Sequence, residues 1–180
     1  MTEESFAEFF TTNFADVWSF ARRRTQSDSD ADDIAAETFA VAWRRRDRLP
    51  AEAGRLWLFG VARNVLANHR RYGERQRRLH LRLVTLDPPP AVQHDPPASE
   101  QVVWAALADL CEDDRELMLL RAWDGLSVAD MAAVLGISAA NVSSRLYKAK
   151  IRLQHNIERR DPQTFGQVLV ESHGKGSNRS

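Results

Sequence analysis

The 180-residue chain lacks the features that mark membrane, secreted or disulfide-stapled proteins. It contains one cysteine, Cys111, so no disulfide can form within the chain. It has no run of about 18 apolar residues, so we expect no membrane insertion. The first residues, Met1–Glu4, are acidic and precede no apolar run. We therefore expect no secretory signal and a protein that acts in the reducing cytoplasm.

The chain also lacks net charge, because 25 basic and 25 acidic side chains cancel. The two signs are nevertheless segregated along the sequence. Residues 1–40 carry 9 acidic and 3 basic side chains, residues 41–85 carry 3 and 12, residues 86–116 carry 8 and 1, and residues 117–160 carry 3 and 7. Basic blocks are typical of phosphate-binding surfaces and acidic blocks suit a basic protein partner, although either can be a solvated helix face.

Proline is scarce except in one stretch, since five of the seven prolines lie in Leu86–Ser99. Such a stretch cannot form a helix and favours extended chain. The sequence therefore predicts a first domain over residues 1–82, a linker over 83–98, a second domain over 99–158 and a flexible tail over 159–180.

Apolar residues recur at helical spacing in both domains, and no segment shows sustained apolar–polar alternation. This periodicity predicts an all-α fold of two small helical domains. The first predicted helix has an apolar stripe on Phe6, Phe9, Phe10, Asn13, Phe14, Val17, Phe20 and Ala21. A second is predicted through Ile34–Arg46, after a capping break at Ser27–Asp30. A third begins at Pro50 and buries Leu56, Phe59, Ala62, Val65 and Leu66.

Caps define the helices of the second domain. Ser99 is predicted to cap a helix whose inward residues are Val103, Ala106, Leu107 and Leu110. Asp113 and Glu116 have capping-box spacing, which predicts the next helix. Gly125 suits the position after that helix. Ser127 and Asp130 then open a short third helix.

The segment Val128–Ser138 carries the sharpest local signal. A helix-turn-helix needs a small residue where its helices cross and a residue that tolerates positive φ in the turn. Ala132 and Gly136 supply these at the required spacing. The apolar residues that would bury both helices are Met131, Leu135, Ile137 and Val142. We predict that this domain binds DNA.

The helix after Ser138 separates its faces. Its predicted buried stripe comprises Val142, Leu146, Ala149 and Leu153. The opposite side carries Asn141, Ser144, Arg145, Lys148 and Arg152, flanked by Ser143, Tyr147 and Lys150. These side chains can reach base edges and phosphates in a major groove. The alternative is a helical hairpin with a basic, solvated face.

An acidic cluster precedes the second helix of the first domain, with carboxylates at Asp28, Asp30, Asp32, Asp33 and Glu37. Three interpretations compete. Asp33 and Glu37 share a helix face and could bind a metal ion, although no histidine lies nearby. Acidic residues also stabilise a helix N-terminus. The third interpretation is a surface for a partner protein, extended by Phe39 and Trp43.

The third helix carries a second polar face. Trp57, Val61, Asn64, Asn68, Arg71 and Arg75 follow steps of four and three. A mixture of an aromatic ring, amides and guanidiniums suits unpaired DNA, whose bases stack on rings while its phosphates meet arginines. The alternative is that Trp57 is part of the core and the arginines are solvated.

The whole pattern resembles the extracytoplasmic-function (ECF) sigma factors. Asp30–Trp43 resembles their region 2 signature, which binds the clamp helices of the β′ subunit of RNA polymerase. Trp57–Asn64, followed by Asn68–Arg71, resembles the part that melts and recognises the −10 element. Leu110–Leu153 resembles region 4, which recognises the −35 element. The resemblance covers roughly residues 5–156.

Residue by residue, the resemblance implies three sets of contacts. Those to core polymerase are Asp30, Asp33, Ile34, Glu37, Phe39 and Trp43. Those to the −10 DNA are Arg55, Trp57, Arg63, Asn64, Asn68, Arg70 and Arg71, with the loop Asp47–Arg55 near a flipped-out base. Those to the −35 duplex are Ser138, Asn141, Ser143, Ser144, Arg145, Tyr147, Lys148 and Arg152. The chain departs from the family pattern at Ala36, which we expect to weaken the polymerase contact. It also departs at Asn68, Asn141, Lys148 and Lys150, which leave the recognised promoter sequence open.

The resemblance implies core RNA polymerase and promoter DNA as partners, with an anti-sigma factor as a further candidate. It implies no enzyme, no catalytic residue, no cofactor and no metal. One alternative is a stand-alone helix-turn-helix regulator that binds a palindromic operator as a dimer. Another is a metal-dependent nuclease that uses the aspartate cluster around Asp33.

Overall fold

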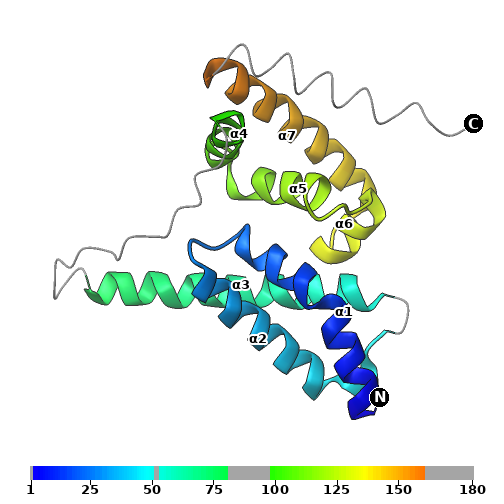
Figure 1. Cartoon of the computed structure of the whole chain (residues 1–180). Coiled ribbons are helices and arrows are strands. Elements are labelled where there is room, and N and C mark those ends of the chain that lie inside the picture. Colours follow the sequence, from blue (N-terminus) through cyan, green and yellow to red (C-terminus); the bar gives the residue numbers. More distant parts are fainter. Residues whose placement is uncertain (1, 51–52, 81–97, 161–180) are drawn as a thin grey trace, which may run out of the picture. The chain divides into compact units, whose positions relative to one another are not determined.

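The computed structural model describes residues 2–50, 53–80 and 98–160. Every regular element within these residues is a helix. The chain divides into two compact units: the described residues up to His80 belong to the first, and nearly all of those from Ala98 on belong to the second (Figure 1). The predicted all-α, two-domain fold is confirmed. The predicted linker and tail lie almost wholly outside the described residues. None of the described helices is long and apolar enough to cross a membrane.

The first unit comprises three helices, α1 (Glu3–Arg22), α2 (Asp28–Arg44) and α3 (Gly54–His80), and a short 3-10 turn at Arg46–Arg48. Each of the three helices packs against the other two. Side-chain caps fix where the first two begin. Thr2 accepts a hydrogen bond from the Ser5 N–H at 3.3 Å, and Ser27 accepts one from the Asp30 N–H at 3.0 Å. The predicted cap before α2 is therefore confirmed at Ser27. The predicted bounds are not, because Asp28–Asp30 already belong to the helix and it ends at Arg44 rather than at Arg46.

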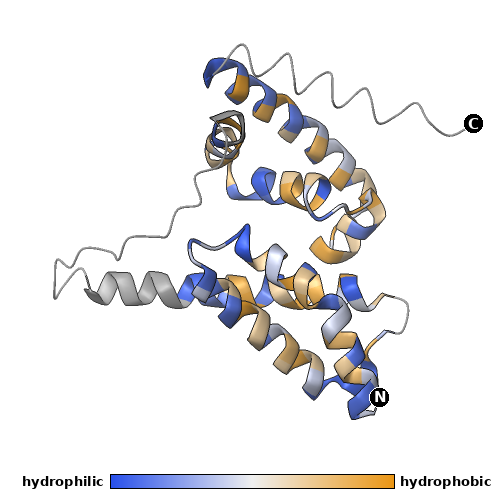
Figure 2. Ribbon diagram, in the orientation of Figure 1, coloured by the Kyte–Doolittle hydropathy of each residue, from blue (hydrophilic) through white to orange (hydrophobic). Residues whose placement is uncertain are grey.

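The core of the first unit lies where the three helices meet. It contains the buried side chains of Val17, Phe20, Ile34, Ala35, Phe39, Ala42, Leu58, Phe59, Ala62, Val65 and Leu66. Thr38 is also buried, and its hydroxyl donates to the Ile34 carbonyl oxygen at 2.7 Å. The polar group is thereby satisfied within the helix. Figure 2 shows hydrophobic residues following one side of α2.

Three expectations for this unit are wrong in detail. The third helix begins at Gly54 rather than at Pro50, and the ring of Phe9 lies 2.6 Å from where a Cβ of Gly54 would stand. A larger residue there would displace that ring. Leu58 is fully buried although the predicted stripe omits it, whereas Leu56, which the stripe includes, is only half-buried. Phe10 and Phe14, predicted to face inward, are 39% and 37% exposed.

The second unit contains α4 (Ala98–Ala108), α5 (Glu112–Ala122), α6 (Val128–Leu135) and α7 (Ala139–Arg160). Helix α7 packs against both α4 and α5. It buries Val142, Leu146, Ala149, Leu153 and Ile157, so the predicted stripe is confirmed and extends one step further. Hydrophobic and hydrophilic residues alternate along α7 in Figure 2, as expected of a helix with one buried face.

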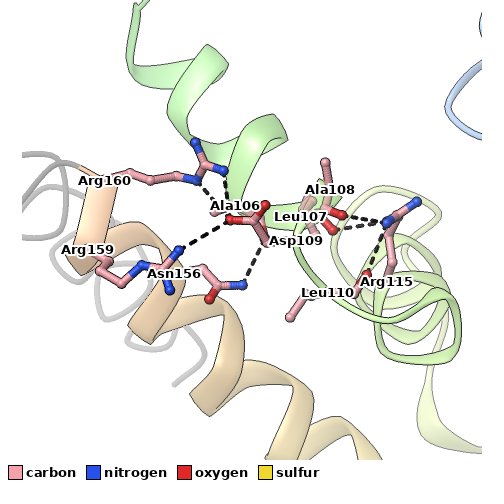
Figure 3. A network of polar contacts seen from close by, with 9 residues as sticks. All are labelled: Ala106, Leu107, Ala108, Asp109, Leu110, Arg115, Asn156, Arg159 and Arg160. Carbon is pink, nitrogen blue, oxygen red and sulfur yellow. Dashed lines mark hydrogen bonds and ion pairs between the residues drawn. The ribbon is translucent and has the colours of Figure 1, made fainter.

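A polar network joins α7 to the turn between α4 and α5 (Figure 3). Asp109 accepts two hydrogen bonds from Arg160, at 2.7 and 3.1 Å. Asn156 donates to the Ala106 carbonyl oxygen at 3.2 Å. Arg115 donates to the carbonyl oxygens of Leu107, Ala108 and Leu110 at 2.7–3.0 Å. The bonds from Asn156 and Arg115 give the carbonyls at the end of α4 side-chain partners, where the helical ladder runs out.

The capping expectations for the second unit have mixed outcomes. Ser127 and Asp130 form the predicted reciprocal box, with bonds of 3.0 and 3.1 Å, and Ser138 accepts from the Asn141 N–H at 3.2 Å. Two expectations are wrong. Helix α4 begins at Ala98, so Ser99 lies inside its first turn. Helix α5 begins at Glu112, so Asp113 is helical and does not cap.

Candidate functional site

The helix-turn-helix is formed by α6, the turn at Gly136 and α7. Gly136 has φ +68°, a conformation that glycine adopts without a steric cost, and the Ile137 N–H donates to the Ala132 carbonyl oxygen at 3.2 Å. Met131 and Val142 are fully buried on either side of the turn. The turn therefore joins α6 to α7 in the order and with the turn conformation that a helix-turn-helix requires.

The outer face of α7 is polar and accessible. The exposed residues on this face are Asn141, Ser143, Ser144, Tyr147, Lys148, Lys150 and Arg152, with Ser138 exposed just before the helix. Tyr147 is 68% exposed, and Ile151, which the sequence analysis did not single out, is 50% exposed. The predicted DNA-facing residues thus share one open surface, to which Ile151 adds an apolar side chain.

Two arginines of α7 are anchored to carboxylates of α5. Arg145 donates to Asp113 at 2.7 Å, and Arg152 donates to Asp114. The partners lie 32 and 38 residues apart in the sequence, and no local pattern could have paired them. Asp113 and Asp114 are therefore functional candidates that the sequence analysis missed.

The acidic surface of α2 is formed by Asp33 and Glu37, which are both exposed. Trp43, 38% exposed, continues the surface one helical turn beyond Phe39 and packs edge-on against Phe6 with 4.9 Å between ring centroids. The guanidinium of Arg46 lies 4.5 Å from the centre of the Trp43 ring. Trp43 is therefore an aromatic side chain held by two neighbours, on the same helix as the two exposed carboxylates and nearer its C-terminal end.

The other aspartates of the cluster have partners inside the unit. Asp32 accepts a hydrogen bond from Trp18 Nε1 at 2.7 Å, and Asp28 is paired with Arg22 at 2.5 Å. Asp30 lies 3.8 Å from His69 Nε2. Within the described residues, no three histidine, cysteine, aspartate or glutamate side chains come together in a way that could hold a metal ion.

Two residues expected at the polymerase contact lie in the core instead. Ile34 is 1% exposed and Phe39 is 4% exposed. The Phe39 ring packs edge-on against Phe10, with 4.6 Å between centroids. Both side chains are therefore closed off from the surface of the folded domain, and Phe39 is covered by α1. Their place is beneath the surface that Asp33 and Glu37 form.

The polar face of α3 is open to solvent along most of its described length. Arg63, Asn64, Asn68, Arg70 and Arg71 are all exposed, and Trp57 is half-buried at the start of the face. The side chain of Arg75 lies outside the described residues. Arg55, in the first turn of α3, is paired with Asp16 at 2.5 Å and lies 4.8 Å from the centre of the Phe59 ring.

Two family models match the chain, Sigma-70 region 2 over residues 9–76 and Sigma-70, region 4 over residues 100–153. The ECF RNA polymerase sigma factor SigC of Mycobacterium tuberculosis is 33% identical over 157 residues, which cover 83% of this chain and 82% of that protein. The RNA polymerase sigma factor CnrH of Cupriavidus metallidurans is 32% identical over 140 residues, covering 70% and 72%.

Solved structures share the fold. The sigma factor RpoE of Bartonella quintana, crystallised with the anti-sigma factor NepR, superposes with a TM-score of 0.69 at 24% identity over 86% of this chain and 98% of that one. CnrH in complex with the cytosolic domain of CnrY gives a TM-score of 0.66 at 22% identity, over 89% and 92%.

Proposed function

Because the chain belongs to the extracytoplasmic-function sigma factors of RNA polymerase, we propose that it binds core polymerase and directs it to promoters through three separate surfaces. The observation that carries this proposal is the order of these surfaces along the chain. An acidic α2, a basic α3 and a helix-turn-helix follow one another within regions that the two family models cover.

The proposed contact with core polymerase is the exposed side of α2. Asp33 and Glu37 supply negative charge, and Trp43 supplies an apolar ring with limited freedom. A surface of this composition suits a basic partner helix, in keeping with the β′ clamp helices that the family resemblance implies. Ile34 and Phe39 act indirectly, by fixing α2 on α1 from below.

The proposed contact with the −10 element is the open face of α3. Its exposed arginines, Arg63, Arg70 and Arg71, suit phosphates, and Asn64 and Asn68 can donate to and accept from unpaired bases. We include Trp57 as a ring on which a base can stack. Arg55, anchored by Asp16, lies at the start of this face beside the loop that the resemblance places near a flipped-out base.

The proposed contact with the −35 element is the outer face of α7. The helix is long enough to lie in a major groove, with Asn141, Ser144, Arg145 and Lys148 toward its N-terminal half. Arginine can grip a guanine edge with two parallel hydrogen bonds, whereas lysine acts as a point charge. Arg145 is therefore our first candidate for base recognition, and Lys148 for phosphate.

The protein in this account is an initiation factor and not an enzyme, and we place its action in the cytoplasm with RNA polymerase. We propose an anti-sigma factor as a further partner, because the related RpoE and CnrH structures were solved with NepR and CnrY. Such a partner would silence the protein by covering the surfaces described above.

Holoenzyme assembly tests the polymerase contact. The full chain should co-elute with bacterial core RNA polymerase in size-exclusion chromatography, and Asp33→Ala and Glu37→Ala should each weaken co-elution. Glu8→Ala, which removes the same charge from an exposed position on α1, is the matched control and should co-elute like the unaltered chain. Equal behaviour of all variants would remove α2 from the contact, and no co-elution of the unaltered chain would reject the proposed function.

A further inference from the structure

Arg145 and Arg152, two arginines of the proposed −35 face of α7, are each bonded to a carboxylate of α5. Asp113 accepts from Arg145 Nη2 at 2.7 Å, and Asp114 accepts from Arg152. The two aspartates lie in the first turn of α5. They reach the same helix at positions seven residues apart, which is two helical turns.

Burial distinguishes the two carboxylates. The Asp114 side chain is 6% exposed, so its charge is removed from water and is compensated by Arg152. The Asp113 side chain is 74% exposed, so its charge stays in contact with water. The arginines themselves remain accessible, with 34% of the Arg145 side chain and 58% of the Arg152 side chain exposed. Each arginine is thus anchored to a carboxylate while part of its side chain remains exposed.

A guanidinium can bond to a carboxylate and to DNA at the same time, because it carries several N–H donors in one plane. A bond to a carboxylate uses part of that fork and leaves other donors for a base edge or a phosphate. The anchor also restricts a flexible side chain before DNA arrives, so less conformational entropy is lost on binding. A carboxylate close to bound DNA repels the phosphates of any sequence. This repulsion weakens binding to all DNA, and it is offset only where the anchored arginine makes a specific contact with a base.

From these contacts we infer that Asp113 and Asp114 are positioning residues for −35 recognition, which orient the Arg145 and Arg152 guanidiniums toward the duplex and raise sequence discrimination at the expense of non-specific affinity. This inference rests on the proposed function. It concerns how the −35 face discriminates between sequences, and it assigns no direct DNA contact to either aspartate.

The test uses holoenzyme assembled from core RNA polymerase and the full chain. Binding is compared on a promoter that the protein uses and on versions with single substitutions in the −35 element. Asp113→Asn should lower the ratio of cognate to substituted binding by about fivefold or more, since part of a two-pronged base contact is lost. The same variant should bind unrelated duplex DNA more tightly, with a salt dependence that is steeper by about one released ion.

Asp109→Asn is the matched control. Asp109 also pairs with arginines of α7, Arg159 and Arg160, but these lie in its last turn (Figure 3). This control should leave the discrimination ratio unchanged. Arg145→Lys, which keeps the charge and loses the fork, should reproduce the loss seen in Asp113→Asn, and the double variant should lose little more because both changes break one unit.

The outcomes separate the inference from the function on which it rests. If the unaltered holoenzyme does not distinguish −35 sequences, the proposed −35 contact fails. If it does, and Asp113→Asn keeps the full ratio or gains equally on all DNA, the positioning role is wrong and Asp113 only lowers surface charge. Asp113 is largely exposed, so its variant is expected to fold, which circular dichroism would verify.

Discussion

The ring of Phe20 lies nearly parallel to the ring of Phe59, with 4.7 Å between centroids and 15° between planes. The guanidinium of Arg24 lies 3.6 Å from the centre of the Phe20 ring, and that of Arg55 lies 4.8 Å from the centre of Phe59. Helices α1 and α3 are therefore joined by two stacked rings with a guanidinium over each. Because Arg55 also pairs with Asp16 of α1, the start of the α3 face is fixed both in the core and at the surface.

Phe59→Ala should destabilise the first domain by about 3–5 kcal/mol, because it removes a buried ring and leaves the Phe20 ring without its stacking partner. Hydrogen exchange of the α1, α2 and α3 amides would measure this loss separately from the second domain. Phe14→Ala, at a position 37% exposed, should cost much less. Equal loss of protection in the two variants would contradict the assignment of the core.

Ser127→Ala should weaken the helix-turn-helix by about 0.5–2 kcal/mol, because the first turn of α6 loses the acceptor for the Asp130 N–H. Ser127→Asp retains an acceptor at the cap and should preserve most of the stability. Urea unfolding of both variants would compare them. A Ser127→Asp variant as unstable as Ser127→Ala would mean that the hydroxyl has another role.

Gly136→Ala and Gly60→Ala should change stability in opposite directions. A Cβ has open space at both positions, so sterics with neighbours do not distinguish them. Gly136 has φ +68°, which costs an alanine about 1–2 kcal/mol. Gly60 lies inside α3, where alanine should stabilise by about 0.5–1 kcal/mol. Thermal unfolding measures both, and stabilisation by Gly136→Ala would refute the account of the turn.

Arg63→Ala and Arg71→Ala should each weaken promoter binding by the holoenzyme and reduce its salt slope by about one, because both arginines are exposed on the proposed −10 face. Filter binding over a range of salt concentrations gives the slope. Arg159→Ala, at an exposed arginine of the last turn of α7, is the control and should leave it unchanged. An unchanged slope in both α3 variants would mean that this face meets no phosphate.

What the sequence could predict was decided by local contacts. Ser127 and Asp130 are three residues apart, so their capping box could be predicted from spacing alone, as could the positive φ of Gly136. Asp113 and Glu116 have the same spacing, but Asp113 pairs with Arg145, 32 residues away. The helix begins at Glu112, two residues before the start that a cap at Asp113 implies. A distant ion pair of this kind leaves no trace in a local pattern.

Burial, too, could be predicted where it depends on one helix and not where it depends on how two helices pack. The stripe of α7 was predicted correctly because one face of a long helix must be covered. Phe39 resembles a surface contact in sequence, but α1 places Phe10 against it and buries it, while Phe10 itself stays 39% exposed. Which of two neighbouring aromatic residues is covered depends on how α1 and α2 cross, and spacing within one helix does not determine that.

Run-off transcription tests the central claim most directly. Core RNA polymerase would transcribe a panel of genomic promoter fragments alone and with this protein added. We predict start-site-specific transcripts only when the protein is present, with reduced yield for Glu37→Ala or Trp43→Ala and normal yield for Glu8→Ala. A protein that directs no transcripts and does not bind core polymerase, yet shifts duplex DNA as a dimer, would contradict the account and be a stand-alone helix-turn-helix regulator.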